Sequence, residues 1–322
     1  MDKEGIRTFL IAVFGLTAAL QALTFFLGKW IEAYPSAELA ATLGLCLIPA
    51  VSARLAHAVG NHAYAAPEIG ALGLGRFVTV SLGTLGAFVV IYGSLTVLGL
   101  STPDWSMDVV LNHSSIPKGT FAGVNPVLVQ FGTAALALVL SLLIAPLLFL
   151  VFTLPMEYGW RSYLFPRLLP LGKFRAAVVG GVLWALWLYL PMLTRLVAAN
   201  RLDGVHLAAL SVLPGYDFAV KPLSLFLALV MMVMFGIALT AFLGRVWLEK
   251  GTAMSAALWL ACIFAQAAGF WSVLFPDESL LVRGWAGLAG SAIWLAATVV
   301  AGFVYSRTSR SEAPVEAPHT ET

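Results

Sequence analysis

The sequence predicts an all-α, polytopic membrane protein with about eight transmembrane helices. Of its 322 residues, 60% are hydrophobic and only 11% are charged, and the mean hydropathy is +0.92. Soluble globular domains are roughly 45–50% apolar and about 25% charged. Several apolar runs also reach the roughly 17–25 residues that a helix needs to cross the hydrocarbon core of a bilayer. The lipid bilayer is therefore the expected surrounding of most of the chain.

Eight apolar segments are expected to form the spans. In chain order they cover residues 8–27, 36–53, 78–100, 125–153, 175–197, 222–244, 252–275 and 284–305. The first is too long for the apolar region of a typical signal peptide, and no small-residue cleavage site follows it, so it is expected to remain as a span. The second has the weakest pattern, because Glu38 lies near its start and Pro49 interrupts its end.

The segments outside the spans are polar. Residues 101–123 and 198–221 form the longest connections and are expected to be loops. Residues 307–322 are polar and contain prolines, so they cannot bury apolar surface, and a disordered cytoplasmic tail is expected. Residues 1–306 are thus predicted to form one transmembrane helical bundle.

The distribution of Lys and Arg predicts the orientation of this multi-pass protein in the cell membrane. With the N-terminus in the cytoplasm, twelve of the 18 Lys and Arg residues fall on the cytoplasmic side, and six fall outside: Lys29, Lys118, Arg195, Arg201, Lys221 and Arg283. Because cytoplasmic loops carry the excess of positive charge, both termini are expected in the cytoplasm.

The charge balance and the cysteines exclude other classes of protein. A net charge of +2 and a pI near 8.6 are too mild to indicate a nucleic-acid partner. The two cysteines, Cys46 and Cys262, both lie in apolar runs. They are expected to be small core residues, so the sequence implies neither a disulfide framework nor a thiolate metal site.

The stretch PMEYGWRSYLFPRL, residues 155–168, places two opposite charges at the end of a long apolar run. On a helix, Glu157 and Arg161 share one face at the spacing at which opposite charges meet. A charged side chain at the bilayer centre costs about 2.5–3.5 kcal/mol on insertion scales, so a partner is expected. One interpretation is therefore purely structural: the ion pair fixes a turn between the fourth span and an amphipathic helix.

The same stretch resembles the first signature of the CPBP family, the CAAX proteases and bacteriocin-processing proteins, which are intramembrane endopeptidases. The family pattern, E-E-x-G-W-R-G-Y-L-x-P-R-L, is matched in register at Gly159, Trp160, Arg161, Tyr163, Leu164, Pro166, Arg167 and Leu168. WALWLYLP at 184–191 is similar to the second signature, W-A-L-W-H-L-P, and EKGTAMSAALWLACIFAQ at 249–266 stands in the place of the third. The resemblance implies a CPBP-like helical bundle with its core at about residues 125–275.

In that family a glutamate and a histidine activate a water, and a second histidine and an asparagine hold the oxyanion. The resemblance places Met156 at the first glutamate and Glu157 at the second, and a thioether cannot accept a proton from water. The histidine of the second signature falls on Leu188 or Tyr189, depending on the anchor. Tyrosine can donate a hydrogen bond, but it is a poor base at neutral pH.

The third signature is also altered. Leu260 and Phe264 stand where the family has histidine and asparagine. Gln266 lies about 200° around the helix from Phe264, so it is expected to face another way. The five histidines lie in loops, at a span edge or in the tail: His57, His62, His113, His206 and His319. They offer no convincing ligand set, so no catalytic metal and no other cofactor is expected.

The motif residues that remain define the candidate site. Glu157 and Arg161 are what is left of the catalytic motif. The resemblance implies an apolar cavity that holds a peptide or lipidated tail in active relatives, and its expected lining here is Met156, Tyr158, Trp184, Trp187, Tyr189, Trp259 and Phe264. The alternative for these aromatic residues is plain core packing or a belt at the membrane interface.

Three functions remain open. The favoured one is a catalytically degenerate pseudo-protease that binds or scaffolds a membrane peptide or protein. The second is an active intramembrane endopeptidase for membrane-tethered peptides, CAAX-like or bacteriocin-related, with Glu157 as a displaced base helped by Tyr189 or another group. The third is a carrier of small lipophiles, although the spans contain few of the polar groups and helix breaks that transporters use.

Overall fold

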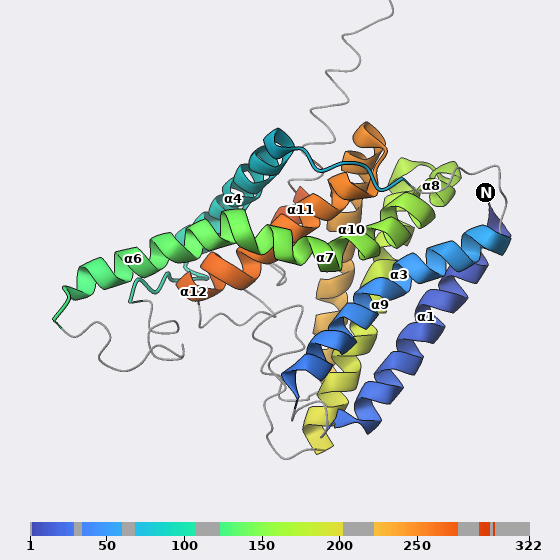
Figure 1. Cartoon of the computed structure of the whole chain (residues 1–322), viewed down its shortest axis with the longest axis horizontal. Coiled ribbons are helices and arrows are strands. Elements are labelled where there is room, and N and C mark those ends of the chain that lie inside the picture. The colour runs from blue at the N-terminus through green and yellow to red at the C-terminus, as the bar shows by residue number, and fades with distance from the viewer. Residues whose placement is uncertain are drawn as a thin grey trace, which may run out of the picture.

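The computed structural model describes residues 2–28, 34–59, 68–106, 123–201, 222–275, 290–296 and 299. In this part of the chain every regular element is a helix (Figure 1). Among the described residues, seven helices are long and apolar enough to cross a membrane: Lys3–Phe26, Ser36–Val59, Leu74–Val97, Pro126–Leu171, Lys173–Thr194, Phe226–Lys250 and Ala253–Leu274. The predicted class, an all-α multi-pass membrane protein, is confirmed.

The other sequence predictions fall partly outside the described residues. The eighth span, 284–305, is described only at 290–296 and 299, and the tail 307–322 lies outside altogether. The greater part of the connections 101–123 and 198–221 also lies outside. The orientation of the bundle in the membrane stays a prediction.

The helices follow one another with short connections over much of the chain. They are α1 (Lys3–Phe26), α3 (Pro35–Val59), α4 (Leu74–Val97), α6 (Pro126–Val139), η1 (Leu140–Ile144), α7 (Ala145–Glu157), η2 (Tyr158–Leu164), α8 (Phe165–Leu168), η3 (Leu169–Leu171), α9 (Lys173–Arg201), α10 (Pro222–Lys250), α11 (Ala253–Gln266), η4 (Ala267–Trp271) and α12 (Ser272–Leu274). The segments η1, η2 and η4 are π-helical, and η3 is a 3₁₀ turn.

Local chemistry explains where several helices begin. The Asp2 carboxylate accepts a hydrogen bond from the Gly5 N–H at 2.9 Å and caps α1. At α6, the Asn125 side chain accepts from Val127 at 2.9 Å, and Pro126 occupies the first turn, where its missing N–H has no cost. Gly172 has a φ of 92°, a conformation that favours glycine, and it separates η3 from α9.

The fourth span continues further than predicted. The sequence predicted a span over 125–153 followed by a turn, but the structure forms one helix over Pro126–Leu171, which ends at Gly172. The chain passes the site of the expected turn as the π-helical segment η2, whose seven residues are all buried. Burial explains the correction, because backbone groups buried away from water need partners and continuing the helix supplies them.

The helices form two groups, which meet where α3 packs against α7 and η2 and where α10 packs against α11 and η2. In Figure 1, α1, α3, α9 and α10 run together, while α4, α6–α7 and α11 form the second group. The most extensive packing joins α9 to α10, α11 to α7 and α1 to α3, and η2 contacts helices of both groups. A Cβ on Gly181 of α9 would collide with the backbone of Ile237 on α10, so these two helices approach at the distance of backbone contact. The site residues on η2 therefore lie at the junction.

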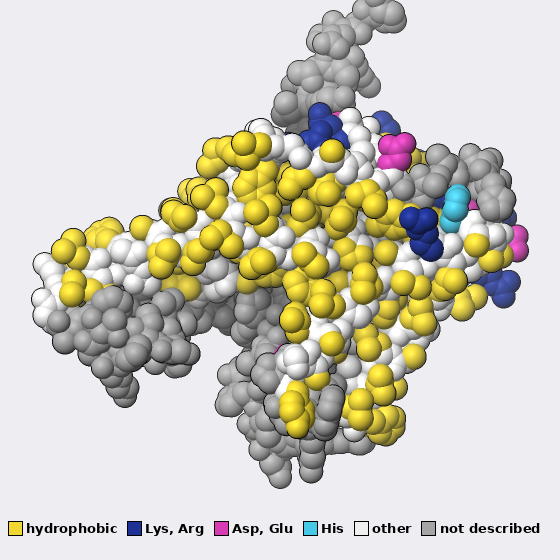
Figure 2. Space-filling view, in the orientation of Figure 1, with side chains coloured by type: hydrophobic (Ala, Val, Ile, Leu, Met, Phe, Trp, Pro, Cys, Tyr) yellow, Lys and Arg dark blue, Asp and Glu magenta, His cyan; other side chains and the backbone are white. Residues whose placement is uncertain are grey.

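The outer surface of the protein is largely apolar. Figure 2 shows hydrophobic side chains over most of the visible face, with charged side chains gathered near the ends of the helices. Large apolar side chains such as Ile11, Phe131 and Leu148 are more than half exposed. This surface is what a lipid environment requires, since water would penalise so much exposed apolar area.

Candidate functional site

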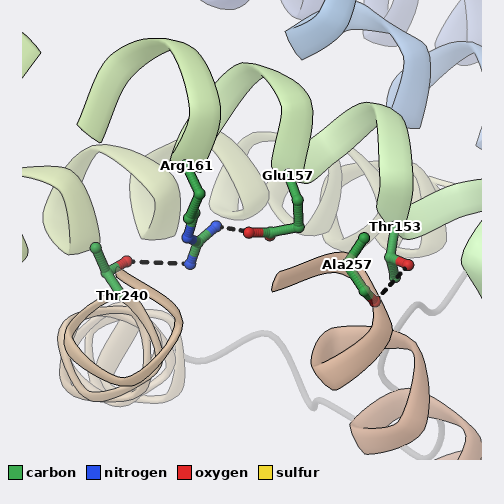
Figure 3. A network of polar contacts seen from close by, with 5 residues as sticks. All are labelled: Thr153, Glu157, Arg161, Thr240 and Ala257. Atoms are coloured by element: carbon green, nitrogen blue, oxygen red, sulfur yellow. Dashed lines mark hydrogen bonds and ion pairs between the residues drawn. The ribbon is translucent and has the colours of Figure 1, made fainter. Parts of the chain in front are cut away.

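The predicted pair of Glu157 and Arg161 forms an ion pair inside the bundle. Arg161 Nη1 donates to Glu157 Oε1 at 2.9 Å, and the two side chains are 1% and 0% exposed. Arg161 Nη2 donates to the hydroxyl of Thr240 on α10 at 3.2 Å (Figure 3). The guanidinium thus joins the end of α7 to a residue 79 positions later in the chain.

Trp184 completes the surroundings of the Arg161 side chain. The Arg161 Cζ atom lies 5.4 Å from the centroid of the Trp184 ring, a cation–π distance. Trp184 packs in turn against Phe235 of α10, with 6.3 Å between the ring centroids. A buried charge needs such compensation from a partner charge, hydrogen bonds and polarisable rings, because water no longer solvates it.

A second polar contact lies one turn earlier on the same helix. The Thr153 hydroxyl donates to the carbonyl of Ala257 on α11 at 3.0 Å. Thr153, Glu157 and Arg161 therefore form a polar row along α7 and η2, and Figure 3 shows the three side chains on the same stretch of ribbon. This row ties α7 and η2 to α11 at one end and to α10 at the other.

The motif residues of η2 serve as packing residues in this protein. A Cβ on Gly159 would collide with the Pro49 backbone, so η2 and α3 are in backbone contact there. The Trp160 ring lies 5.4 Å from Phe9 of α1 and 5.6 Å from Trp187 of α9, measured between centroids. The matched positions therefore build the junction between helices.

The aromatic residues predicted to line a cavity each contact different neighbours. Trp184 contacts the ion pair. Trp187, on the same helix, donates from Nε1 to the Thr17 hydroxyl of α1 at 2.8 Å. Tyr158 lies beneath the Arg54 guanidinium of α3, with 5.4 Å from Cζ to the ring centroid. Trp184, Trp187 and Tyr158 are all buried.

The remaining predicted lining residues also pack against neighbours of their own. Met156 and Phe264 are buried, and Phe264 lies 6.2 Å from the ring of Phe149. Trp259 makes an edge-on contact with Phe242 at 4.9 Å, while Tyr189 is half-buried beside the cluster that contains Met231. These are the contacts of core residues, and one cavity lined by all seven side chains stays a prediction.

Sequence reasoning missed a second buried ion pair. Arg167 Nε donates to Asp2 Oδ2 at 3.0 Å, and the side chains are 1% and 2% exposed. Arg167 also donates from Nη1 to the Tyr163 carbonyl at 3.0 Å and lies 3.8 Å from the Tyr163 ring centroid. An Asp just before a helical run is a signal that could have identified Asp2 as a helix cap, but nothing in the sequence indicates a partner 165 residues away.

The seventh predicted span, 252–275, forms as Ala253–Leu274, and the structure adds a break near its end. The helix breaks at Gly269, where φ is −99° and ψ is −111°. The Ser141 hydroxyl accepts from the freed Phe270 N–H at 2.8 Å. Gln266 faces this region: its Nε2 donates to the Ser141 carbonyl at 3.4 Å, and its Oε1 accepts from Trp271 Nε1 at 3.0 Å. This span therefore contains both a break and buried polar groups.

Few functional groups surround Glu157. Its carboxylate contacts the Arg161 guanidinium, and that guanidinium also contacts the Thr240 hydroxyl and the Trp184 indole. Within the described ranges, no three His, Cys, Asp or Glu side chains are grouped closely enough to hold a metal ion. The site therefore pairs one buried carboxylate with one guanidinium.

Comparison with known proteins adds no family assignment. No protein-family profile matches the chain, and the comparison with curated proteins finds no match either. The geometry itself supports a coarser conclusion: the chain is an integral, multi-pass membrane protein with a buried Glu157–Arg161 pair where its two groups of helices meet.

Proposed function

We propose that this protein is a pseudo-protease with a CPBP-like bundle, which binds or scaffolds a membrane peptide or protein without cleaving it. The observation that carries the proposal is the state of Glu157. Its Oε1 accepts from Arg161, and both side chains are fully buried. The carboxylate thus holds the Arg161 guanidinium, which in turn bonds Thr240 on α10.

Peptide hydrolysis makes two demands that this arrangement leaves unmet. A general base must take a proton from water, and donors must stabilise the oxyanion. The residue before Glu157 is Met156, and the side chains that surround Arg161 are Thr240 and Trp184. Neither threonine nor tryptophan acts as a base at neutral pH. This set supports a structural role for the pair.

The helix Pro126–Leu171 offers the surface for a membrane partner. Only 11% of its most apolar stretch is buried inside the protein, against 67% for Ala253–Leu274, so it presents the larger free face to the bilayer. Exposed side chains on it include Leu128, Phe131 and Leu143. Transmembrane helices associate through van der Waals packing, and we assign the partner to this helix because it is the least covered of the seven.

A peptidase assay tests the catalytic half of the proposal. The protein, reconstituted in liposomes, is incubated with a panel of membrane-tethered peptides, and products are identified by mass spectrometry. We expect no cleavage above the background of empty liposomes. Cleavage that Glu157→Gln abolishes, in a folded variant, would overturn the proposal. Glu249→Gln is the control, since Glu249 also pairs with an arginine four residues away but is exposed.

Photo-crosslinking in native membranes tests the binding half. A photoreactive phenylalanine analogue replaces Phe131, and in a second variant it replaces Ile11 of α1, which is similarly exposed at 63% against 66%. We expect a discrete protein adduct at Phe131 and only lipid adducts at Ile11. Lipid adducts alone at both positions would contradict a partner on this helix.

A specific observation also supports the carrier alternative. Interrupted helices with polar groups beside them are common at the binding sites of transporters, and the chain is interrupted at Gly269 beside Ser141 and Gln266. Counterflow of a labelled lipophile into liposomes would support this function. Equal uptake by liposomes without protein would argue against the carrier function.

A further inference from the structure

Two π-helical segments lie against each other in the second group of helices. The segment η1 (Leu140–Ile144) interrupts the long helix Pro126–Leu171, and η4 (Ala267–Trp271) follows α11. The two segments are in contact. A π-helical turn departs from the regular hydrogen bonding of an α-helix, and sharp kinks occur at such turns. Two neighbouring spans are therefore interrupted at the same level.

Side-chain hydroxyls bond the backbone at this level. The chain leaves helical geometry at Gly269, where a Cβ would collide with the Ser141 side chain of η1. The Ser141 hydroxyl accepts from the Phe270 N–H at 2.8 Å. The Ser272 hydroxyl lies 2.9 Å from the carbonyl oxygens of both Ala268 and Gly269. Since these hydroxyls can rotate, the backbone at the break can change its angle and keep its hydrogen bonds.

The third helix of the group, α4, passes the break at a glycine. A Cβ on Gly83 would lie against Trp259 of α11, which precedes the break. The ring of Phe88 stacks on Trp271, which follows the break, with 6.0 Å between the centroids. Gly86 lies between these two contacts, and a Cβ on it would meet no described atom within 4 Å. Glycine inside a helix leaves the backbone freer than alanine does, so α4 is also less rigid at this level.

The parts beyond the break are joined to one another. Tyr92 of α4 stacks on Trp271, with 5.0 Å between the centroids and 5° between the planes, and on Phe275 at 4.5 Å. The Asp104 N–H donates to the Leu274 carbonyl at 2.7 Å. The helix α6 contacts η4 as well. The end of α4, α12 and α6 are thus connected as one unit.

We propose that η1, the break at Gly269 and Gly86 form one hinge, about which α6, α12 and the end of α4 bend together relative to α7. In Figure 1, α6 extends from this level away from α1 and α3. Its 14 residues span about 21 Å, so a bend of about 20° moves its far end by about 7 Å. The alternative is a fixed kink that only shapes the bundle. The hinge goes beyond the proposed function and does not rest on it.

Distance distributions from double electron–electron resonance test the hinge in the full-length protein in nanodiscs. A spin-labelled amino acid is encoded at Leu128 of α6 and Leu47 of α3, which are 68% and 50% exposed. The control pair joins Leu47 to Leu148, which is 63% exposed and lies on the same long helix as Leu128 but on the other side of η1. We expect the Leu128 pair to be broader than the control pair by about 7 Å, the displacement of the far end of α6. Equal widths would overturn the hinge.

A pair of alanine variants separates the hinge from fraying at the end of α6. Gly86→Ala stiffens α4 at the proposed hinge, so it should narrow the Leu128 distribution. Gly132→Ala is the matched control, because a Cβ there also meets no described atom within 4 Å, but it lies on α6 beyond the hinge. It should leave the distribution unchanged. A distribution that Gly86→Ala fails to narrow, or that Gly132→Ala narrows equally, would overturn the proposal.

Discussion

Replacing the charges of Glu157 and Arg161 singly and together tests whether the pair clamps the helix junction. Both side chains are buried, so solvent does not screen their interaction. Arg161→Met removes the ion pair and the hydrogen bond to Thr240, and it leaves a buried carboxylate without its cation. Removing one partner of a buried ion pair costs about 3–5 kcal/mol.

The membrane sets where in this range the cost should fall. Helices that have separated within a bilayer keep their own hydrogen bonds and find other polar partners, which reduces the measured loss. We therefore expect Arg161→Met to lower the free energy of unfolding by about 3 kcal/mol. The double variant with Glu157→Met removes both charges and keeps similar volume. Such replacements are often neutral or stabilising, so most of the loss should be recovered.

The measurement is the free energy of unfolding in bicelles by steric trapping, with the exposed pair of Arg245 and Glu249 as control. Those side chains are 34% and 48% exposed, and Arg245→Met should cost about 0–1 kcal/mol. A change of less than about 0.5 kcal/mol for Arg161→Met, the usual range for surface substitutions, would contradict a stabilising buried pair. A loss in the double variant as large as that of the two single variants combined would contradict it as well.

Three further predictions concern contacts between distant helices, each measured by thermal unfolding in detergent. Asp2→Ala loses both the helix cap and the ion pair with Arg167, so it should lower the free energy of unfolding by about 3–5 kcal/mol. Asp2→Asn keeps the cap and should cost less, so equal stability of the two variants would argue against the ion pair. Trp187→Phe removes one hydrogen bond to α1 and should cost about 1 kcal/mol; no loss would mean that this bond is not made. Gly181→Leu should separate α9 from α10 and cost about 1–3 kcal/mol, whereas leucine at Gly132, where a Cβ meets no neighbour, should be tolerated; an equal loss at both would contradict the close approach.

The helix that carries the site shows which features the local residue spacing predicts and which it does not. Spacing alone predicted that Glu157 and Arg161 would meet, and they do, because two residues four apart share a face on any helix. The same pattern predicted a turn after residue 153, and the helix instead continues to Leu171. Whether a helix stops at such a place depends on what covers it, and here the seven residues of η2 are buried.

The sequence by itself determined that this is an all-α membrane protein and which charges pair along one helix, because composition and helical period act locally. Only the tertiary structure showed that Arg161 also bonds Thr240 and lies over Trp184, and that Asp2 reaches Arg167. It also placed Ser141 at the break beside Phe270, 129 residues later in the chain. These partners come from helices far apart in sequence, and a bilayer sets no register between helices. Side-chain packing sets that register, and packing is a property of the assembled bundle.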